Sequence, residues 1–97
     1  MIYKIKSLKW FNKQVEKLDS KSKEIIYNKI QLLKENPYRY KKIHSKHYSK
    51  VFRIRFSILK KEVKLIYIIV EPNVILVCLL DRKRDYKDLE KYLSKIN

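Results

Sequence analysis

The placement of arginine in this sequence suggests phosphate chemistry. Lysine and arginine together number 25, but only five are arginine, and four of the five lie in the C-terminal half, at Arg53, Arg55, Arg82 and Arg84. Lysine supplies a mobile point charge, whereas the arginine guanidinium is a planar fork that stays protonated and matches a phosphate at two points. We therefore expect these arginines to bind a phosphate of a nucleic acid.

Two of the arginines alternate with apolar residues in the run VFRIRFSI, which predicts a strand. Arg53 and Arg55 then share the face opposite to Phe52 and Ile54, about 7 Å apart along the strand. The next predicted strand, VKLIYIIV, carries a lysine near its start. We expect a cationic groove with one aromatic ring, suited to a single-stranded nucleic acid, formed by Arg53, Arg55, Lys64, Arg82 and Tyr86.

Each of these residues also has a simpler interpretation. Alternating charge opposite apolar residues is routine on the solvated face of a half-buried strand. Lys64 interrupts an apolar strand, but a lysine can extend its ammonium group to solvent from such a place. Tyr86 can cap the core beside a final helix, and the parity of the strand places Tyr67 in the core. The combination of Arg53 and Arg55 with Arg82 and Tyr86 in register favours the functional interpretation.

The pattern of apolar residues predicts the elements that position this groove. Residues 2–6 alternate as a short strand, and Leu8, Phe11, Val15 and Leu18 then follow the spacing of an amphipathic helix. Asp19 and Ser20 offer caps for a second helix that ends at Asn36-Pro37. Residues 38–50 are basic and aromatic without clear periodicity, which predicts an exposed loop. Three strands with short turns follow, and then a short helix that begins at residue 85.

This order of elements predicts an α+β fold in one domain, residues 1–97. We expect the N-terminal strand and the antiparallel helical hairpin to pack on a small antiparallel β-meander, with a short C-terminal helix. The run VILVCLL is apolar at every position, so we expect a central strand covered on both faces. The other face of the sheet is expected to be partly open.

The composition bounds the partners. The net charge is 25 minus 10, or +15, which attracts polyanions, although a lysine-rich surface can also reflect codon bias or solubility. No apolar run approaches the ~20 residues of a membrane-spanning helix, and the N-terminus does not read as a signal peptide. The lone Cys78 fits a buried, reduced thiol in a cytoplasmic protein. His44 and His47 have no obvious third metal ligand, and we expect no cofactor.

The ordered motifs resemble the RelE/ParE superfamily of toxins from type II toxin–antitoxin pairs, and the RelE-like ribonuclease branch most. The resemblance covers nearly the whole chain. The helical hairpin follows the family pattern F…L..L…..I…I..L…P, seen here as Phe11, Leu18, Ile26, Ile30, Leu33 and Pro37. An aromatic-basic-Ile-basic strand comes next, FRIR at 52–55. A basic residue then precedes a tyrosine by three positions, at Lys64 and Tyr67. The last motif is R-x-x-x-Y, at Arg82 and Tyr86.

The resemblance implies a RelE-like fold and an activity. Such toxins cut messenger RNA in the ribosomal A site without a metal, when the 2′-OH of the substrate attacks the neighbouring phosphorus. By this resemblance Arg53 and Arg55 bind the scissile phosphate, Arg82 stabilises the transition state, and Tyr86 stacks on a base or orients the 2′-OH. We expect further RNA contacts from lysines and an arginine around the groove, at Lys50, Lys60, Lys61 and Arg84.

The chain departs from the family pattern in two ways. Members with lysine in the FRIR positions can use it as a general base, but arginine does not give up its proton. The base is therefore Lys64, or Tyr86, or there is none and catalysis is electrostatic. The segment before Tyr86 also reads DRKRDY, where many members have Gly-His or Gly-Lys before the arginine.

Three functions fit this sequence. The first is a ribosome-dependent endoribonuclease toxin that binds mRNA and the ribosome and is neutralised by a small acidic antitoxin. The second is a ParE-like gyrase inhibitor of the same fold, although such members tend to lack the full basic set. The third is a non-catalytic nucleic-acid-binding protein, for which charge and stacking suffice.

Overall fold

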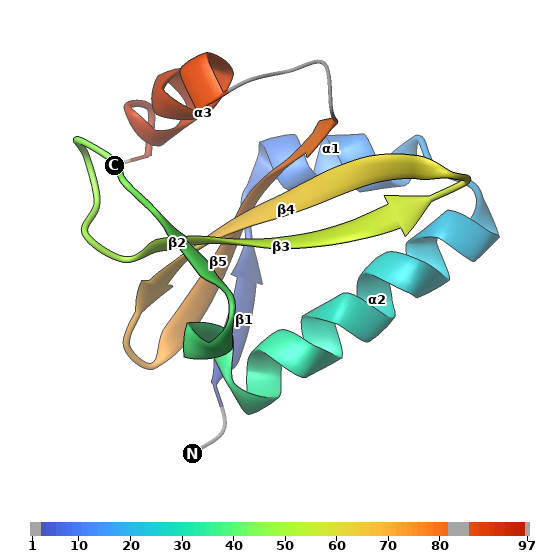
Figure 1. Cartoon of the computed structure of the whole chain (residues 1–97), viewed down its shortest axis with the longest axis horizontal. Coiled ribbons are helices and arrows are strands. Elements are labelled where there is room, and N and C mark those ends of the chain that lie inside the picture. Colours follow the sequence, from blue (N-terminus) through green and yellow to red (C-terminus); the bar gives the residue numbers. More distant parts are fainter. Residues whose placement is uncertain (1–2, 82–85, 97) are drawn as a thin grey trace.

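A computed structural model describes residues 3–81 and 86–96, with the side chains of residues 86–88 left out (Figure 1). The elements follow one another as β1 (Lys4–Ser7), α1 (Lys9–Glu16), α2 (Ser20–Glu35), the 3₁₀ turn η1 (Pro37–Arg39), β2 (Lys41–Ile43), β3 (Val51–Ile58), β4 (Lys61–Val70), β5 (Asn73–Asp81) and α3 (Tyr86–Leu93). Within the described residues, no helix is both long enough and apolar enough to cross a membrane.

The strands form one mixed sheet in the order β1-β5-β4-β3-β2. β1 runs parallel to β5, and the other neighbours are antiparallel. The predicted α+β fold is confirmed, with the meander β3-β4-β5 in the middle of the sheet. The prediction of an exposed loop over residues 38–50 was wrong in part, since β2 forms within it and pairs with β3. A strand of three residues is too short for a sequence period, and the unpaired backbone groups of β3 favour it instead.

The helical hairpin covers one face of the sheet, as predicted. α1 buries Phe11, and α2 buries Ile26 and Leu33 against the strand residues on that face. The α2 helix begins as expected, because the carboxylate of Asp19 accepts a hydrogen bond from the backbone N–H of Ser22 at 3.0 Å. It ends at Glu35, directly before Asn36-Pro37. This layer fixes which strand residues face away from the hairpin.

The opposite face carries a second, smaller core under α3. Leu89 and Leu93 of α3 pack there with strand residues that include Ile66 and Leu80. The register between β4 and β5 shifts between Ile66 and Tyr67, which pair with Cys78 and Leu76 and leave Val77 as an extra residue in β5. Because of it, both Val77 and Cys78 belong to this second core. The predicted burial of β5 on both faces is confirmed, although β4 is the middle strand.

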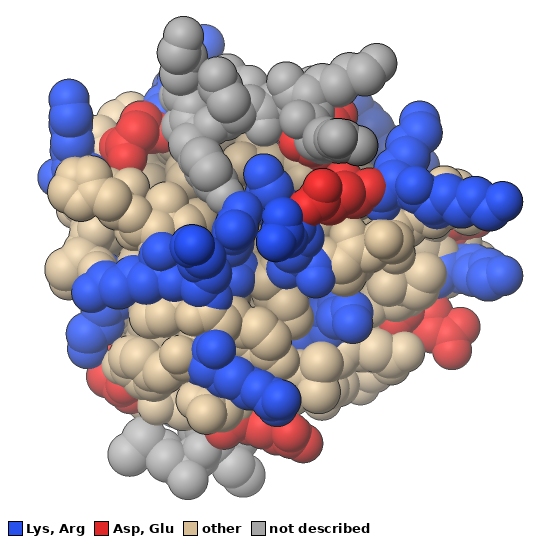
Figure 2. Space-filling model, in the orientation of Figure 1, with Lys and Arg blue, Asp and Glu red and all other residues tan. Residues whose placement is uncertain are grey.

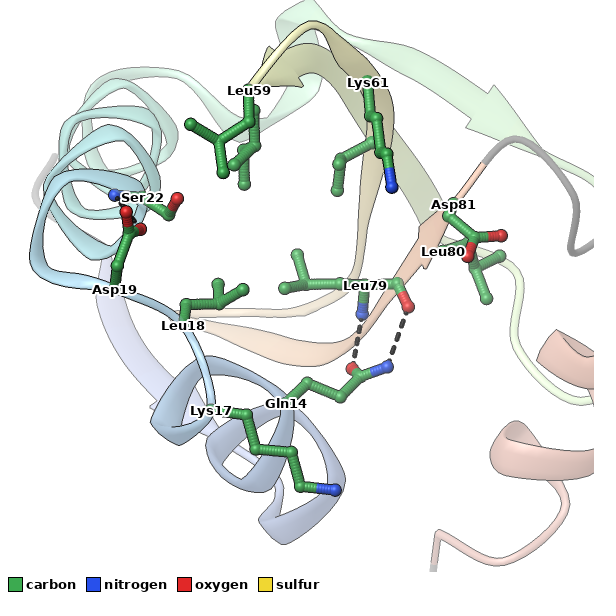
Figure 3. Close-up of a pocket in the computed structure, with 12 residues that line it drawn as sticks. Gln14, Lys17, Leu18, Asp19, Ser22, Leu59, Lys61, Leu79, Leu80 and Asp81 are labelled. Atoms are coloured by element: carbon green, nitrogen blue, oxygen red, sulfur yellow. Dashed lines mark hydrogen bonds between the residues drawn. The ribbon is translucent and has the colours of Figure 1, made fainter.

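A side-chain amide completes the outer edge of β5 where β1 ends. The last paired residues of β1 and β5 are Ser7 and Leu76. Beyond that point Gln14 of α1 donates from Nε2 to the carbonyl oxygen of Leu79 at 2.9 Å and accepts from the Leu79 N–H at 2.7 Å (Figure 3). The Gln14 amide therefore satisfies both backbone groups of Leu79, as a neighbouring strand does.

The tight turn between β3 and β4 holds two non-glycine residues in the left-handed region, Leu59 with φ 50° and Lys60 with φ 67°. Two-residue hairpin turns of this kind favour Asn-Gly, because other side chains cost about 1 kcal/mol or more per residue there. The chain contains no glycine. The leucine side chain is also 66 % exposed, so the core loses little without it.

We expect the double substitution Leu59→Asn/Lys60→Gly to raise the melting temperature by roughly 5 °C, because it relieves this backbone strain. Differential scanning calorimetry measures the shift. Lys23→Gly on the exposed surface of α2 is the control and lowers the melting temperature, because glycine weakens a helix interior. An unchanged or lowered melting temperature in the double variant would contradict the expectation.

Candidate nucleic-acid interface

Four cationic residues line one face of three adjacent strands. Arg55 of β3 lies directly opposite Lys64 of β4. Arg53, two residues earlier in β3, shares their face and lies opposite Lys41 of β2. Cross-strand neighbours of this kind have Cβ atoms about 5 Å apart. We call Lys41, Arg53, Arg55 and Lys64 the cation strip, and Figure 2 shows lysines and arginines gathered across the middle of one face.

The cation strip lies on the face that α3 partly covers. Ile66, the cross-strand partner of Arg53, and Leu80, the partner of Lys64, both belong to the second core. Arg53 and Lys64 are half-buried, whereas Arg55 is exposed. An apolar neighbour lowers the local dielectric and strengthens the field that an incoming phosphate meets. The predicted convergence of positions 53, 55 and 64 is therefore present in the register of the sheet.

One acidic residue lies within this set. The Oε1 atom of Glu62 is 3.0 Å from Nη1 of Arg55, and the side chains are 56 % (Arg55) and 32 % (Glu62) exposed. An ion pair this exposed contributes about 0–1 kcal/mol to stability. We expect a larger effect on the binding of a phosphate, because the carboxylate occupies part of the guanidinium fork that a phosphate would use.

We expect Glu62→Gln to strengthen the binding of a single-stranded RNA by about threefold to tenfold, because it removes a competing negative charge. Fluorescence anisotropy at a fixed salt concentration measures the change. Glu35→Gln at the end of α2 is the matched control, since it changes the net charge equally at an exposed position outside the strip. Equal strengthening in both variants would mean that net charge alone matters.

The C-terminal members of the predicted groove are not placed. Arg82 and Arg84 lie outside the described residues. Tyr86 is the first residue of α3, but its side chain is not described. The predicted roles of these three residues therefore stay predictions. The described part of β5 ends at Asp81, which pairs with Val63, the neighbour of Lys64.

The predicted RNA-contacting lysines lie apart from the cation strip. Lys50 donates to the hydroxyl of Tyr38 at 3.2 Å, which raises the pKa of the lysine and keeps it charged. Lys60 is exposed in the β3–β4 turn. Lys61 lies opposite Ile58, and its side chain lines a cavity on the hairpin face (Figure 3). Their contribution to RNA binding stays a prediction, and the geometry does not bring them into the strip.

The hairpin-face cavity has a volume of about 750 Å³ and lies between α1, the start of α2 and the β3–β4 turn. Its walls include Leu18, Ile58, Val63 and Leu79. None of the four strip residues lines it. This cavity is therefore not the place where the arginines converge.

Tyr67 has a structural role, as its strand parity predicts. Its side chain is fully buried, and its hydroxyl donates to the carbonyl oxygen of Pro37 at 2.6 Å. Burial, with a smaller effect of nearby Tyr40, raises the pKa of the Tyr67 hydroxyl well above its usual range. The phenol therefore stays protonated and anchors the 3₁₀ turn η1 to the sheet.

Two residues of this site, Lys41 and Glu62, were not predicted from the sequence. Lys41 joins the strip only because β2 forms, which no sequence period indicated. The position of Glu62 could have been predicted from the sequence, because it lies two residues before Lys64 and so shares its face in a strand. It is also the only acidic residue between Asn36 and Val70. Within the described part of the chain, no cluster of three His, Cys, Asp or Glu side chains could hold a metal ion.

Comparison with known proteins gives the fold a name. No protein-family model matches the chain, and no curated protein matches it in sequence. Among solved structures, a mutant of the E. coli toxin RelE in the free state matches with a TM-score of 0.77 at 16 % identity, over 99 % of this chain and 100 % of that one. The isolated E. coli RelE toxin in another crystal form matches with a TM-score of 0.66, also at 16 % identity, over 97 % and 99 % of the two chains. The predicted RelE-like fold is confirmed over nearly the full length.

Proposed function

We propose that this protein is a toxin that cleaves messenger RNA on the ribosome. The observation that carries the proposal is the placement of Arg53, Arg55 and Lys64 together on one face of a RelE-like sheet. Two guanidinium forks and an ammonium group suit a phosphodiester. The RelE-like ribonucleases, which the sequence motifs resemble, use a basic set in this part of the fold.

The reaction requires little beyond positioning and charge. The 2′-oxygen of the substrate forms a bond to phosphorus, and the bond from phosphorus to the 5′-oxygen of the next nucleotide breaks. The 2′-hydroxyl loses its proton, and the departing 5′-oxygen gains one. The products are a 2′,3′-cyclic phosphate and a free 5′-hydroxyl. Negative charge accumulates on the phosphoryl oxygens, where cations stabilise the transition state.

The proposed roles follow from the positions of the side chains. Arg53 and Arg55 hold the non-bridging phosphate oxygens, since their forks emerge from the same face of β3. Lys64, opposite Arg55, is the candidate to accept the proton of the 2′-hydroxyl. Arg82 is proposed for the transition-state charge and Tyr86 for base stacking or 2′-hydroxyl orientation, on the resemblance alone. The proposed partners are messenger RNA, the ribosome and a small acidic antitoxin, whose charge complements the +15 of this chain. The proposed location is the cytoplasm.

A cell-free translation system tests this function. The purified protein is added, protein synthesis is followed, and cuts in the ribosome-bound message are mapped by primer extension. We expect arrest of synthesis with new 5′-hydroxyl ends in the message. Arrest with intact message would point to another target, and a gyrase supercoiling assay then tests the ParE-like alternative. RNA binding without arrest or cleavage would leave a non-catalytic binding protein.

A further inference from the structure

A second pocket lies at the β2 edge of the sheet. Its volume is about 530 Å³, and it is lined by Lys42, Ile43, His44, Ser45, Tyr48 and Ser49. Five of these six side chains carry a group that can donate a hydrogen bond, and one carries a permanent positive charge. The sequence of this segment predicts an exposed loop with ordinary histidines.

This edge pocket adjoins the cation strip. Ile43 and Tyr48, which line it, pack on the second core, so these walls lie toward the same face of the sheet as the strip. Lys42 pairs with Phe52 of the hairpin-face core, so it lines the pocket from the other side of the β2 edge. Lys41, the last member of the strip, directly precedes Lys42 in β2. Successive residues of a strand are about 3.3 Å apart. An extended polyanion lying along the strip would therefore reach the edge pocket as it leaves β2.

The loop that forms the pocket is held in place by contacts to α3 and to itself. The Tyr48 hydroxyl donates to the carbonyl oxygen of Ile96 at 2.8 Å. The backbone N–H of His47 donates to Oγ of Ser45 at 3.1 Å, which leaves the hydroxyl hydrogen of Ser45 able to donate. His47 Nε2 also lies 3.4 Å from Oε2 of Glu90. A pocket ordered in advance loses less entropy when a ligand binds.

The charge around the edge pocket favours an anion. The sequence contains no aspartate or glutamate from Asn36 to Lys61. Glu90 of α3 contacts the loop through His47, and neither residue lines the pocket. The described walls of the pocket thus combine Lys42, two serine hydroxyls and an imidazole with no carboxylate.

We propose that the edge pocket binds a backbone phosphate of single-stranded RNA, on the strand that the cation strip engages. The inference rests on the proposed function for the identity of the polyanion. Lys42 supplies the charge, and the hydroxyls of Ser45 and Ser49 donate to the phosphate oxygens. This pocket extends the RNA footprint beyond the scissile link, and its contacts do not depend on base identity.

Fluorescence anisotropy with a 2′-O-methylated single-stranded oligonucleotide tests the proposal. This probe lacks the attacking hydroxyl, so the measurement is independent of cleavage. Lys42→Ala is expected to weaken binding about tenfold and to reduce the salt dependence of log K by about one unit, as for one lost phosphate contact. Ser45→Ala/Ser49→Ala is expected to weaken binding about threefold or more without any change in net charge.

Two matched controls separate a built pocket from diffuse attraction. Lys21→Ala and Ser20→Ala change exposed residues at the start of α2, and both should bind within about twofold of the unaltered protein. Equal weakening by Lys42→Ala and Lys21→Ala, with normal binding of the double serine variant, would overturn the proposal. Thermal melts of each variant identify any loss of folding. If the double serine variant is unfolded, the comparison of Lys42→Ala with Lys21→Ala tests the proposal. The protein can fail to cleave message and still show the Lys42 and serine effects, so the two proposals fail separately.

Discussion

Replacing Arg53 with alanine is expected to slow message cleavage by about 10²-fold or more, which is the usual cost of removing one donor that stabilises transition-state charge. Arg53 is half-buried, lies between Lys41 and Ile66, and shares its face with Arg55 and Lys64. Arg53→Lys keeps the charge but loses the planar fork, so it should recover only part of the rate. Single-turnover cleavage of ribosome-bound message measures both variants.

Arg39→Ala is the matched control for this prediction. Arg39 is exposed in the 3₁₀ turn η1 and takes no part in the cation strip, yet its loss changes the net charge equally. We expect its cleavage rate to stay within about twofold of the unaltered protein. If Arg53→Ala and Arg39→Ala are equally active, Arg53 only contributes to the general positive field.

The second prediction concerns the proton of the 2′-hydroxyl. If Lys64 accepts it, Lys64→Met should cleave about 10²- to 10⁴-fold more slowly, the usual contribution of a general base. Lys64→Arg should then be nearly as slow, because arginine keeps the positive charge but does not accept a proton at working pH.

The pair of variants distinguishes the possibilities that the sequence left open. Substantial activity in Lys64→Arg together with a slow Lys64→Met would show that Lys64 acts only by its charge. Tyr86→Phe then tests the other candidate base. RNA binding by all three variants is the control, since a proton acceptor affects the rate more than the affinity.

The sequence was sufficient for the parts of the fold that depend on local periodicity. Strand alternation alone assigned Arg53 and Arg55 to one face and Phe52 to the other, and the structure confirms this. The same parity placed Tyr67 in the core. Both inferences hold because a side-chain period of two leaves no freedom once one face is buried.

The remaining features depend on partners distant in sequence. β2 forms because β3 has an unpaired edge, so its position follows from the sheet and not from Lys41–Ile43 themselves. The contact of Glu62 with Arg55 depends on the register of the β3–β4 hairpin, which the strained turn at Leu59 and Lys60 sets. The register could be guessed from an Asn-Gly turn, but this chain uses neither residue there.

The Gln14 amide has a consequence for self-association. A strand with free backbone groups invites the edge of another molecule, and proteins protect such edges with charges, bulges or covering elements. Here one glutamine from α1 pairs with the N–H and C=O of Leu79 in the stretch where β1 no longer covers β5. A neutral amide thus leaves neither the N–H nor the C=O of Leu79 available to a strand of another molecule, and the high positive charge of the chain also opposes association.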